Sequence, residues 1–233
     1  MSLNLNLSKQ NLQLTLEKKN IPSITNMNVE FAMDVSASFA DEHRNGYTQQ
    51  FLNRFVPFAL LFDPDKKMGM YAFSSSYEKL KDVSESNYQD YVSSTIRTCS
   101  VYNCGTNYSE VIKEMITPSK DKPGVFSSFF KPSETKVPPK LCFFVTDGEP
   151  FDTSKTLNVL KELEGSNTFI VLISISSKPI SFLETMQRSQ NVTYMNFTPQ
   201  ELKQIQSVSD ENLYDRLLDD ELTTWLKSYN SIN

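Results

Sequence analysis

The sequence of 233 residues is poor in the residue types that define several protein classes, with three cysteines, one histidine and six glycines. Cys99, Cys104 and Cys142 do not provide a disulfide framework. A single histidine poorly supplies a structural zinc site. Basic residues are also in deficit, since 23 Lys and Arg face 28 Asp and Glu, for a net charge of −5. An acidic chain lacks the counterion release that drives non-specific nucleic-acid binding, so we expect no nucleic-acid partner.

Long hydrophobic runs are absent as well. The longest strongly apolar run covers residues 169–173 and extends at most to Ile175, far short of the ~20 residues that cross a bilayer. The first seven residues alternate Leu with polar residues, without the basic region and continuous apolar stretch of a signal peptide. We therefore expect no transmembrane segment and a cytoplasmic location. The oligomeric state stays open.

Regular hydrophobic patterns are present along the chain, whose composition of 39% hydrophobic and 22% charged residues is typical of one globular domain. In residues 1–26, leucines at positions 3, 5, 7 and again at 12, 14, 16 alternate with polar residues. This period of two predicts a short N-terminal β-hairpin. Such a hairpin cannot stand alone, so it should lie on the main domain or belong to an interface.

Strand patterns alternate with helical patterns over residues 27–233. Residues 140–146 and 168–175 are almost wholly apolar, which indicates strands buried on both faces, as in a parallel sheet. The sequence therefore predicts an α/β fold with a doubly wound, mostly parallel central sheet and helices on both faces. A proline-rich tract, residues 118–139, is expected to be a loop insertion. We predict strands at 27–33, 68–73, 77–83, 140–146, 168–175 and 192–195, and helices at 47–62, 88–96, 108–116, 156–163, 182–188, 199–205 and 210–229.

Oxygen-bearing side chains follow the predicted strands where those strands end. Asp34-Val35-Ser36-Ala37-Ser38 follows the first strand, Asp147-Gly148-Glu149 follows the strand at 140–146, and the loop Cys104-Gly105-Thr106-Asn107 precedes a helix. In open parallel sheets ligands bind in the loops at the carboxyl ends of strands. Two of the six glycines, Gly105 and Gly148, fall in these loops, where a close backbone approach or a positive φ would favour glycine.

These loops offer the ligand set of a hard cation: two aspartates and three neutral hydroxyls. Mg²⁺ prefers such oxygens, with Mn²⁺ and Ca²⁺ as alternatives. Two aspartates balance a divalent ion without exceeding its charge, so the metal could still attract a carboxylate from outside. Alternatively, the same side chains cap helices and turns. Asn107 and Glu149 could orient the ligands, and ordinary capping is nearly as well supported for both.

At these residues the sequence resembles the von Willebrand factor A (vWA) domain with a metal-ion-dependent adhesion site (MIDAS), over about residues 27–229. The resemblance assigns the metal to Asp34, Ser36, Ser38, Thr106 and Asp147. Finer features are similar to the TerF-like tellurium-resistance and copine branch: Phe58-Ala59-Leu60-Leu61-Phe62-Asp63, Gly105-Thr106-Asn107-Tyr108, Tyr214-Asp215-Arg216-Leu217-Leu218 and Trp225-Leu226. The opening Leu7-Ser8-Lys9 is similar to TerD-like stress proteins. Three features depart from that branch: Cys104, Phe39 and the 118–139 tract.

Three functions compete for this site. The first is a protein-binding module, in which Mg²⁺ completes its coordination with an Asp or Glu of a partner, in a stress-response or tellurium-resistance setting. The second is a metal-dependent hydrolase or phosphatase. We expect no enzyme, because no positioned base, histidine cluster or phosphate-binding glycine loop accompanies the aspartates. The third is a scaffold subunit whose metal only stabilises the fold.

Several other residues carry structural expectations. We expect His43 to be an exposed turn residue, Cys99 and Cys104 to be free thiols, and Trp225 to dock the last helix. Packing onto the domain is favoured over a partner-binding wedge for the three phenylalanines Phe126, Phe129 and Phe130. A solvated face is favoured over a phosphate site for the lysines Lys113, Lys120, Lys122, Lys131, Lys136 and Lys140.

Overall fold

A six-stranded sheet forms the centre of the computed structural model, which describes residues 4–118 and 137–230. The strand order is β3-β2-β1-β4-β5-β6; all neighbours are parallel except β2 and β3. This is the predicted doubly wound, mostly parallel sheet. The strands are β1 (Asn28–Asp34), β2 (Met68–Phe73), β3 (Tyr77–Val83), β4 (Lys140–Thr146), β5 (Thr168–Ile175) and β6 (Val192–Phe197).

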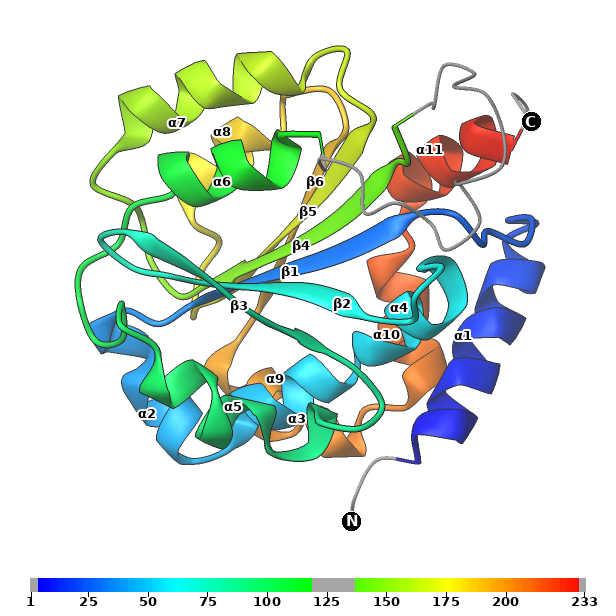
Figure 1. Ribbon diagram of the computed structural model, residues 1–233, viewed down its shortest axis with the longest axis horizontal. Helices are drawn as coiled ribbons and strands as arrows, with labels where there is room; N and C mark the ends of the chain where they lie inside the picture. Colours follow the sequence, from blue (N-terminus) through cyan, green and yellow to red (C-terminus); the bar gives the residue numbers. More distant parts are fainter. Residues whose placement is uncertain (1–3, 119–136, 231–233) are drawn as a thin grey trace, which may run out of the picture.

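Helices cover both faces of this sheet (Figure 1). One face carries α6 (Ser109–Ile116), α7 (Thr153–Leu160) and α8 (Ser181–Met186). The other carries α1 (Leu5–Lys18), α2 (Ala40–Arg44), α3 (Tyr47–Asn53), α4 (Val56–Phe62), α5 (Tyr91–Ser94), α9 (Pro199–Lys203), α10 (Asp210–Leu217) and α11 (Asp220–Asn230). Short 3-10 turns lie at Ala37–Phe39, Tyr88–Asp90, Ile96–Thr98, Lys161–Leu163 and Ile205–Ser207.

The central strands are buried on both faces, as their continuous hydrophobicity predicts. Successive residues of β4, Phe143 and Phe144, enter opposite cores: Phe143 packs with Phe55 and Phe58, and Phe144 packs with Phe73 and Tyr108. Side chains of a strand alternate between faces, so each such strand contributes to two hydrophobic cores. The sheet is thereby fixed between its two helical layers.

The strand order reverses between β1 and β4. The chain runs from β1 outward through β2 to β3 and then returns to place β4 on the other side of β1. Strands β1 and β4 are paired in parallel, from Asn28 opposite Lys140 to Met33 opposite Val145. Asp34 and Asp147 therefore leave adjacent strands at the switch point, where open α/β sheets bind ligands. This edge, at the left of Figure 1, is called the carboxyl edge below, and the opposite edge the amino edge.

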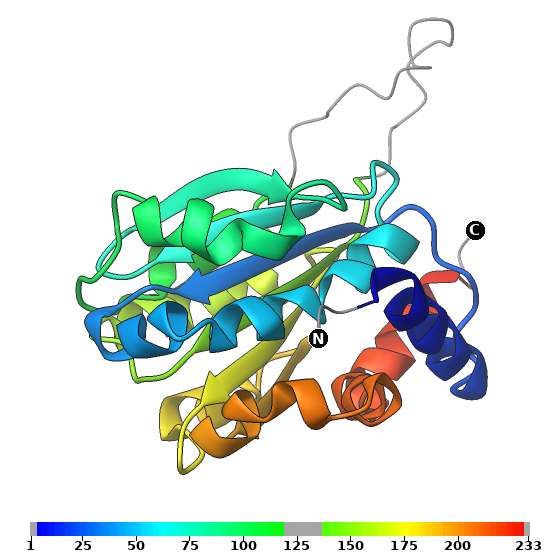
Figure 2. The ribbon, with the colours of Figure 1, turned by 90° about the horizontal axis from the view of Figure 1, so that it is seen from below.

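The predicted N-terminal hairpin is wrong, because residues 5–18 form helix α1. The buried Leu5, Leu12 and Leu16 share one helical face, while Leu7 and Leu14 are 51% and 53% exposed. Leucines at these positions satisfy both a period of two and a helical period. Burial against α4 and α10 selects the helix, whose N-cap is Asn4. Both ribbon views place α1 beside α10 at the amino edge (Figures 1 and 2).

Other helices are shorter than predicted. The helix expected at 47–62 breaks into α3 and α4, because Pro57 has no N–H to continue the ladder. The helix expected at 210–229 breaks after Leu217, where Asp219 accepts a hydrogen bond from Leu222 N (2.9 Å) and from the Thr193 hydroxyl. Helix α2 occupies the segment in which the sequence predicts His43 to be a turn residue.

Trp225 docks α11 as predicted, packing on Phe169 at 5.3 Å between ring centroids. Most of the 118–139 tract, including Phe126, Phe129 and Phe130, lies outside the described residues. Lys120, Lys122, Lys131 and Lys136 lie outside them too. Among the residues that the structure does describe, no helix combines the length and apolar character needed to span a membrane.

Candidate metal centre

Asp34, the last residue of β1, is fully buried beneath the carboxyl edge. Its Oδ1 accepts a hydrogen bond from Ser36 N at 2.8 Å, which turns the chain out of the strand. Its Oδ2 accepts one from the Thr146 hydroxyl at 2.6 Å, across the β1–β4 pair. Both carboxylate oxygens are therefore fixed in place before any metal binds.

Ser36, Ser38 and Asp147 continue from Asp34 toward the surface. The Ser36 and Ser38 hydroxyl oxygens lie 3.2 Å apart, and the Ser38 hydroxyl donates to Asp147 Oδ1 at 3.0 Å. Ser36 is buried, Asp147 is partly buried and Ser38 is exposed. The structure thus brings together four of the five residues that the MIDAS resemblance assigns. Their oxygen atoms form a row from the buried Asp34 to the exposed Ser38.

The fifth residue, Thr106, lies in a loop that docks against the serine loop. Ala37 N donates to Cys104 O at 3.0 Å, and Asn103 N donates to Val35 O at 2.7 Å. Thr106 itself is 8% exposed. Backbone hydrogen bonds therefore hold the threonine loop beside the Ser36 and Ser38 loop, although Thr106 and those serines are far apart in sequence.

The charged side chains at this site are all acidic among the described residues. Burial, followed by the nearby Asp147, raises the pKa of Asp34 to about 7. Burial also raises the pKa of Asp147, and the charge of Glu42 adds to that shift. Within residues 4–118 and 137–230, neither carboxylate forms an ion pair with Lys, Arg or His. Two carboxylates that repel each other without a cation between them form a favourable environment for a bound cation.

The donor set fits a hard divalent cation. Carboxylate and hydroxyl oxygens are the ligands of Mg²⁺, Mn²⁺ and Ca²⁺. The described residues contain no group of three or more His, Cys, Asp or Glu side chains that could hold a metal. A cation at this edge would therefore depend on the hydroxyls of Ser36, Ser38 and Thr106 as much as on the two aspartates.

Asn107 and Glu149 make contacts away from the five predicted ligands. Asn107 Nδ2 donates to Ser75 O at 2.9 Å, which ties the threonine loop to the turn after β2. Glu149 is exposed and accepts from the Ser181 hydroxyl of α8 at 3.3 Å. A ligand-orienting role for either residue stays a prediction.

His43 is buried, so the expectation of an exposed turn residue is wrong. Its Nε2 lies 2.9 Å from Asp34 O and its Nδ1 lies 2.8 Å from the Thr48 hydroxyl. Burial lowers the pKa of His43 to about 4. The ring supports the loop after β1 through its contact with the backbone oxygen of Asp34. His43 lies on the short helix α2 and faces Phe39, with 5.1 Å between the ring centroids. No sequence pattern indicated that this histidine would be buried.

Tyr108 and Asp152 join the threonine loop to the Asp147 loop. Sequence reasoning missed Asp152, and it quoted Tyr108 only as part of the motif at residues 105–108, without a role. The buried Tyr108 hydroxyl contacts Gly148 O and lies 3.0 Å from the Thr146 hydroxyl, which in turn donates to Asp34. The Asp152 carboxylate accepts from Tyr108 N and Ser109 N, both at 2.9 Å, at the start of α6. All three loops therefore share one hydrogen-bond network.

Only one of the two glycines in these loops is explained by the structure. A Cβ on Gly105 would lie 3.3 Å from the Phe151 ring and 3.3 Å from the Ser75 hydroxyl, so the close approach predicted there is confirmed. Gly148 has no positive φ, and a Cβ on it would meet no atom within 4 Å. The same expectation for Gly148 is wrong.

Cys99 and Cys104 are free thiols, as predicted; Cys99 is half-buried and Cys104 is exposed.

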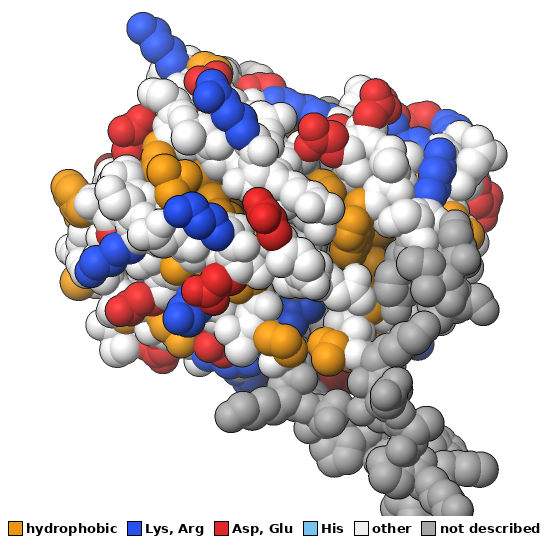
Figure 3. Space-filling view, turned by 90° about the horizontal axis from the view of Figure 1, so that it is seen from above, with side chains coloured by type: hydrophobic (Ala, Val, Ile, Leu, Met, Phe, Trp, Pro, Cys, Tyr) orange, Lys and Arg blue, Asp and Glu red, His pale blue; other side chains and the backbone are white. Residues whose placement is uncertain are grey.

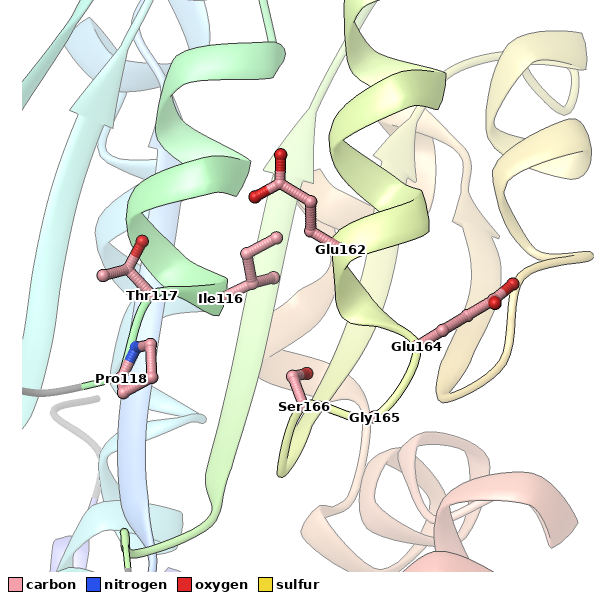
Figure 4. Close-up of a pocket in the computed structure, with 7 residues that line it drawn as sticks. All are labelled: Ile116, Thr117, Pro118, Glu162, Glu164, Gly165 and Ser166. Atoms are coloured by element: carbon pink, nitrogen blue, oxygen red, sulfur yellow. The ribbon is translucent and has the colours of Figure 1, made fainter.

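A surface hollow of about 280 Å³ lies away from the candidate metal centre, at the amino edge between the ends of α6 and α7. Figure 4 shows Glu162, Glu164 and Ser166 on one side of it and Thr117 and Pro118 on the other. The hollow shares no residue with the candidate metal centre.

Comparisons with known proteins agree with this fold. The curated protein YcbR of Bacillus subtilis is 24% identical over 228 residues, covering 96% of this chain and 86% of YcbR. Proximal thread matrix protein 1 of the mussel byssus has a similar structure: TM-score 0.57, 14% identity, and coverage of 84% of this chain and 47% of that one. The chain thus spans about half of that protein, which has also been solved with zinc in its MIDAS motif.

A second similar structure is the manganese-loaded TRAP protein of Plasmodium vivax, with a TM-score of 0.53 and 15% identity over 84% of this chain and 73% of that one. At such low identity these structures show the fold alone. The family match is stronger, because the model of the vWA domain found in the TerF C terminus matches residues 26–232. The chain therefore belongs to the vWA-TerF-like family.

Proposed function

We propose that this vWA domain is a metal-dependent protein-binding module. Asp34, Ser36, Ser38, Thr106 and Asp147 would hold Mg²⁺, and an Asp or Glu of a partner protein would complete the coordination. The metal supplies the positive charge that attracts the partner carboxylate. The chain supplies the oxygen ligands and holds the three loops in register.

The observation that carries this proposal is the pairing of Asp34 with Asp147 without a protein cation in the described residues. Two aspartates balance one divalent ion, and the remaining donors are neutral hydroxyls. The metal therefore keeps an attraction for an outside carboxylate. The mussel protein has been solved with zinc in its MIDAS motif, and the Plasmodium vivax protein has been solved loaded with manganese. Both relatives support the choice of a divalent cation.

A binding role is favoured over hydrolysis because two side chains near the site that could act as a general base, His43 and Tyr108, are buried and already hydrogen-bonded within the protein. Both ring nitrogens of His43 are within hydrogen-bond distance of protein oxygens, and the Tyr108 hydroxyl is buried in the network beneath the loops. Neither group is free to act as a general base toward a substrate. We propose that the protein is not an enzyme and acts in the cytoplasm, in a stress-response setting like that of tellurium resistance.

The test of metal binding is thermal unfolding of the wild type and Asp147→Ala in EDTA, Mg²⁺, Mn²⁺ and Ca²⁺. A free cation at ten times its Kd stabilises the wild type by about 1.4 kcal/mol, or about 3 to 6 °C in Tm for a domain of this size. We expect Asp147→Ala to lose this rise and Asp215→Ala, an exposed aspartate of α10, to keep it. If no cation raises the Tm of the folded wild type, the metal-dependent mechanism is wrong.

The test of binding is a co-purification experiment from cells with Mg²⁺ present throughout, followed by elution with EDTA. A protein recovered by the wild type, released by EDTA and absent with Asp147→Ala supports the binding module. A metal-induced rise in Tm with recovery that ignores both EDTA and Asp147→Ala would instead favour a scaffold with a stabilising metal. Phosphatase turnover lost in Asp147→Ala would favour the hydrolase.

A further inference from the structure

Phe151 is an exposed aromatic residue in the loop that carries Asp147. It is 83% exposed, more than Leu7, Leu14 and Val137, the other large hydrophobic residues exposed in the described part of the chain. Leu7 and Leu14 lie on α1 at the amino edge (Figure 1). Phe151 thus places an apolar ring on the surface beside the proposed metal ligands.

The backbone around Phe151 is held in place. Phe151 N donates to Thr106 O at 2.9 Å, so this residue is bonded directly to a proposed ligand residue. The next residue, Asp152, accepts from Tyr108 N and Ser109 N. These contacts hold the backbone at Phe151 and at the next residue, so a partner that covers the ring does not have to order the loop as well.

The ring itself rests on the threonine loop. A Cβ on Gly105 would lie 3.3 Å from Cε2 and 3.7 Å from Cδ2 of Phe151, so the absence of a side chain at position 105 makes room for the ring. One edge of the ring therefore lies close to Gly105, the residue before Thr106, while most of the ring surface faces water. Large aromatic side chains that a partner can cover often carry much of the binding energy of an interface.

The charge around the site restricts the partner further. Glu42 adds repulsion at Asp147, and Glu149 is exposed in the same loop as Asp147. Seen over α6 and α7, the neighbouring surface mixes acidic and basic side chains with small hydrophobic groups, without a broad basic area (Figure 3). A run of acidic residues in a partner would meet these glutamates, whereas a single carboxylate would meet the metal.

We infer that Phe151 determines which acidic segments the metal centre accepts. The partner segment has one Asp or Glu with a large aliphatic or aromatic residue close to it in sequence, and that residue covers the Phe151 ring. This inference rests on the proposed metal-dependent binding. It adds the class of ligand, an acidic and apolar peptide segment of a protein rather than an acidic tract.

The experiment is selection from a random 12-residue peptide display library in Mg²⁺, with elution by EDTA. The wild type, Phe151→Ser, Asp147→Ala and Leu14→Ser are compared. Leu14→Ser is the matched control, because it removes an exposed hydrophobic side chain at the opposite edge. Thermal unfolding and the metal-induced shift in Tm check that Phe151→Ser is folded and still binds the metal. The hydrogen bond from Phe151 to Thr106 uses only the backbone N–H and is kept in this variant.

With the wild type and Leu14→Ser we expect clones that pair one Asp or Glu with a nearby apolar residue. Synthetic peptides from these clones should bind Phe151→Ser about 10-fold or more weakly, as for a truncated hot-spot residue, and Leu14→Ser within about 2-fold. Acidic clones without an apolar preference, or unchanged affinity in Phe151→Ser, would overturn the role of Phe151 alone. The absence of EDTA-eluted acidic clones from the wild type would overturn both this inference and the proposed function.

Discussion

Strand β1 carries a buried carboxylate toward each end, and the two are treated differently by the rest of the molecule. At the amino edge, Glu30 forms an ion pair with Lys140 at 3.3 Å, with both side chains nearly inaccessible. Lys140 Nζ also donates to Met115 O at 3.1 Å and Thr117 O at 2.7 Å. At the carboxyl edge, Asp34 faces Asp147 and has no cationic partner among the described residues.

The difference separates a structural charge from a functional one. A buried carboxylate is costly unless it is paired and hydrogen-bonded. At the amino edge the chain supplies its own cation, Lys140. Gly69 leaves room for the Glu30 side chain, because a Cβ at position 69 would lie 3.2 Å from Glu30 Cγ. At the carboxyl edge, no Lys, Arg or His of the described residues pairs with Asp34 or Asp147. This lack of a protein cation beside the two aspartates is the reason to propose a metal-binding function for that edge.

The largest expected effect breaks the amino-edge pair. Lys140→Met leaves Glu30 buried without its cation, and we expect the free energy of unfolding to fall by about 3 to 5 kcal/mol. Urea unfolding measures this loss. Lys161→Met, which removes an exposed lysine, should change it by less than about 0.5 kcal/mol. Combining Lys140→Met with Glu30→Leu should recover most of the loss. An equal loss in the double variant would contradict the pairing argument.

The next effect is a pH dependence confined to the carboxyl edge. Burial lowers the pKa of His43 from 6.5 to about 4, so between these values the unfolded chain binds more protons than the folded one. The stability that comes from keeping His43 neutral is therefore present above pH 6.5 and lost as the pH falls toward 4, by up to about 3 kcal/mol.

This pH effect is measured in EDTA as the difference in unfolding free energy between the wild type and His43→Gln. The difference isolates His43, because the raised pKa values of Glu30 and Asp34 act in the opposite direction in both proteins. NMR of the single histidine gives an independent check. Ring signals that titrate near pH 6.5 in the folded protein would rule out a buried neutral His43.

A smaller effect concerns the network beneath the metal loops. Tyr108→Phe removes the hydroxyl that contacts Gly148 O and Thr146, and we expect a loss of about 1 to 2 kcal/mol in stability with weaker Mg²⁺ binding. Tyr214→Phe is the matched control, because its equally buried hydroxyl donates to Arg54 O at 3.2 Å away from the site. Calorimetric titration with Mg²⁺ should detect the change only in Tyr108→Phe.

The smallest effect has the opposite sign from that at the amino edge. In EDTA at pH 8, Asp147→Asn should raise the free energy of unfolding by about 0.5 kcal/mol, because it relieves repulsion with Asp34 and Glu42. In saturating Mg²⁺ the same variant should be less stable than the wild type. Denaturant unfolding under both conditions checks this reversal. A loss of stability in EDTA would mean that Asp147 is needed for the fold itself.

Sequence patterns predicted the strands well but predicted the N-terminal helix and some helix boundaries poorly. β4 and β5 fall at their predicted positions, because a buried parallel strand needs an uninterrupted apolar run. The alternating N-terminal leucines fit a period of two, but Leu5, Leu12 and Leu16 also fit one face of a helix, and packing of that face against α4 and α10 selects the helix. Lys140 was predicted to lie on a solvated face; it is buried at the start of β4, where its ammonium pairs with Glu30 of β1, and no local pattern reveals this pairing.

The candidate site divides in the same way. The sequence by itself determined the α/β class and placed Asp34, Ser36, Ser38, Thr106 and Asp147 in loops after strands or before a helix, because hydrophobic periodicity and side-chain chemistry are local properties. The tertiary structure alone decided that Ser38 meets Asp147, that His43, Tyr108 and Thr146 support the loops, and that Phe151 rests on Gly105. These contacts join residues from different loops and strands, and only the packing of the sheet and its helices brings them together.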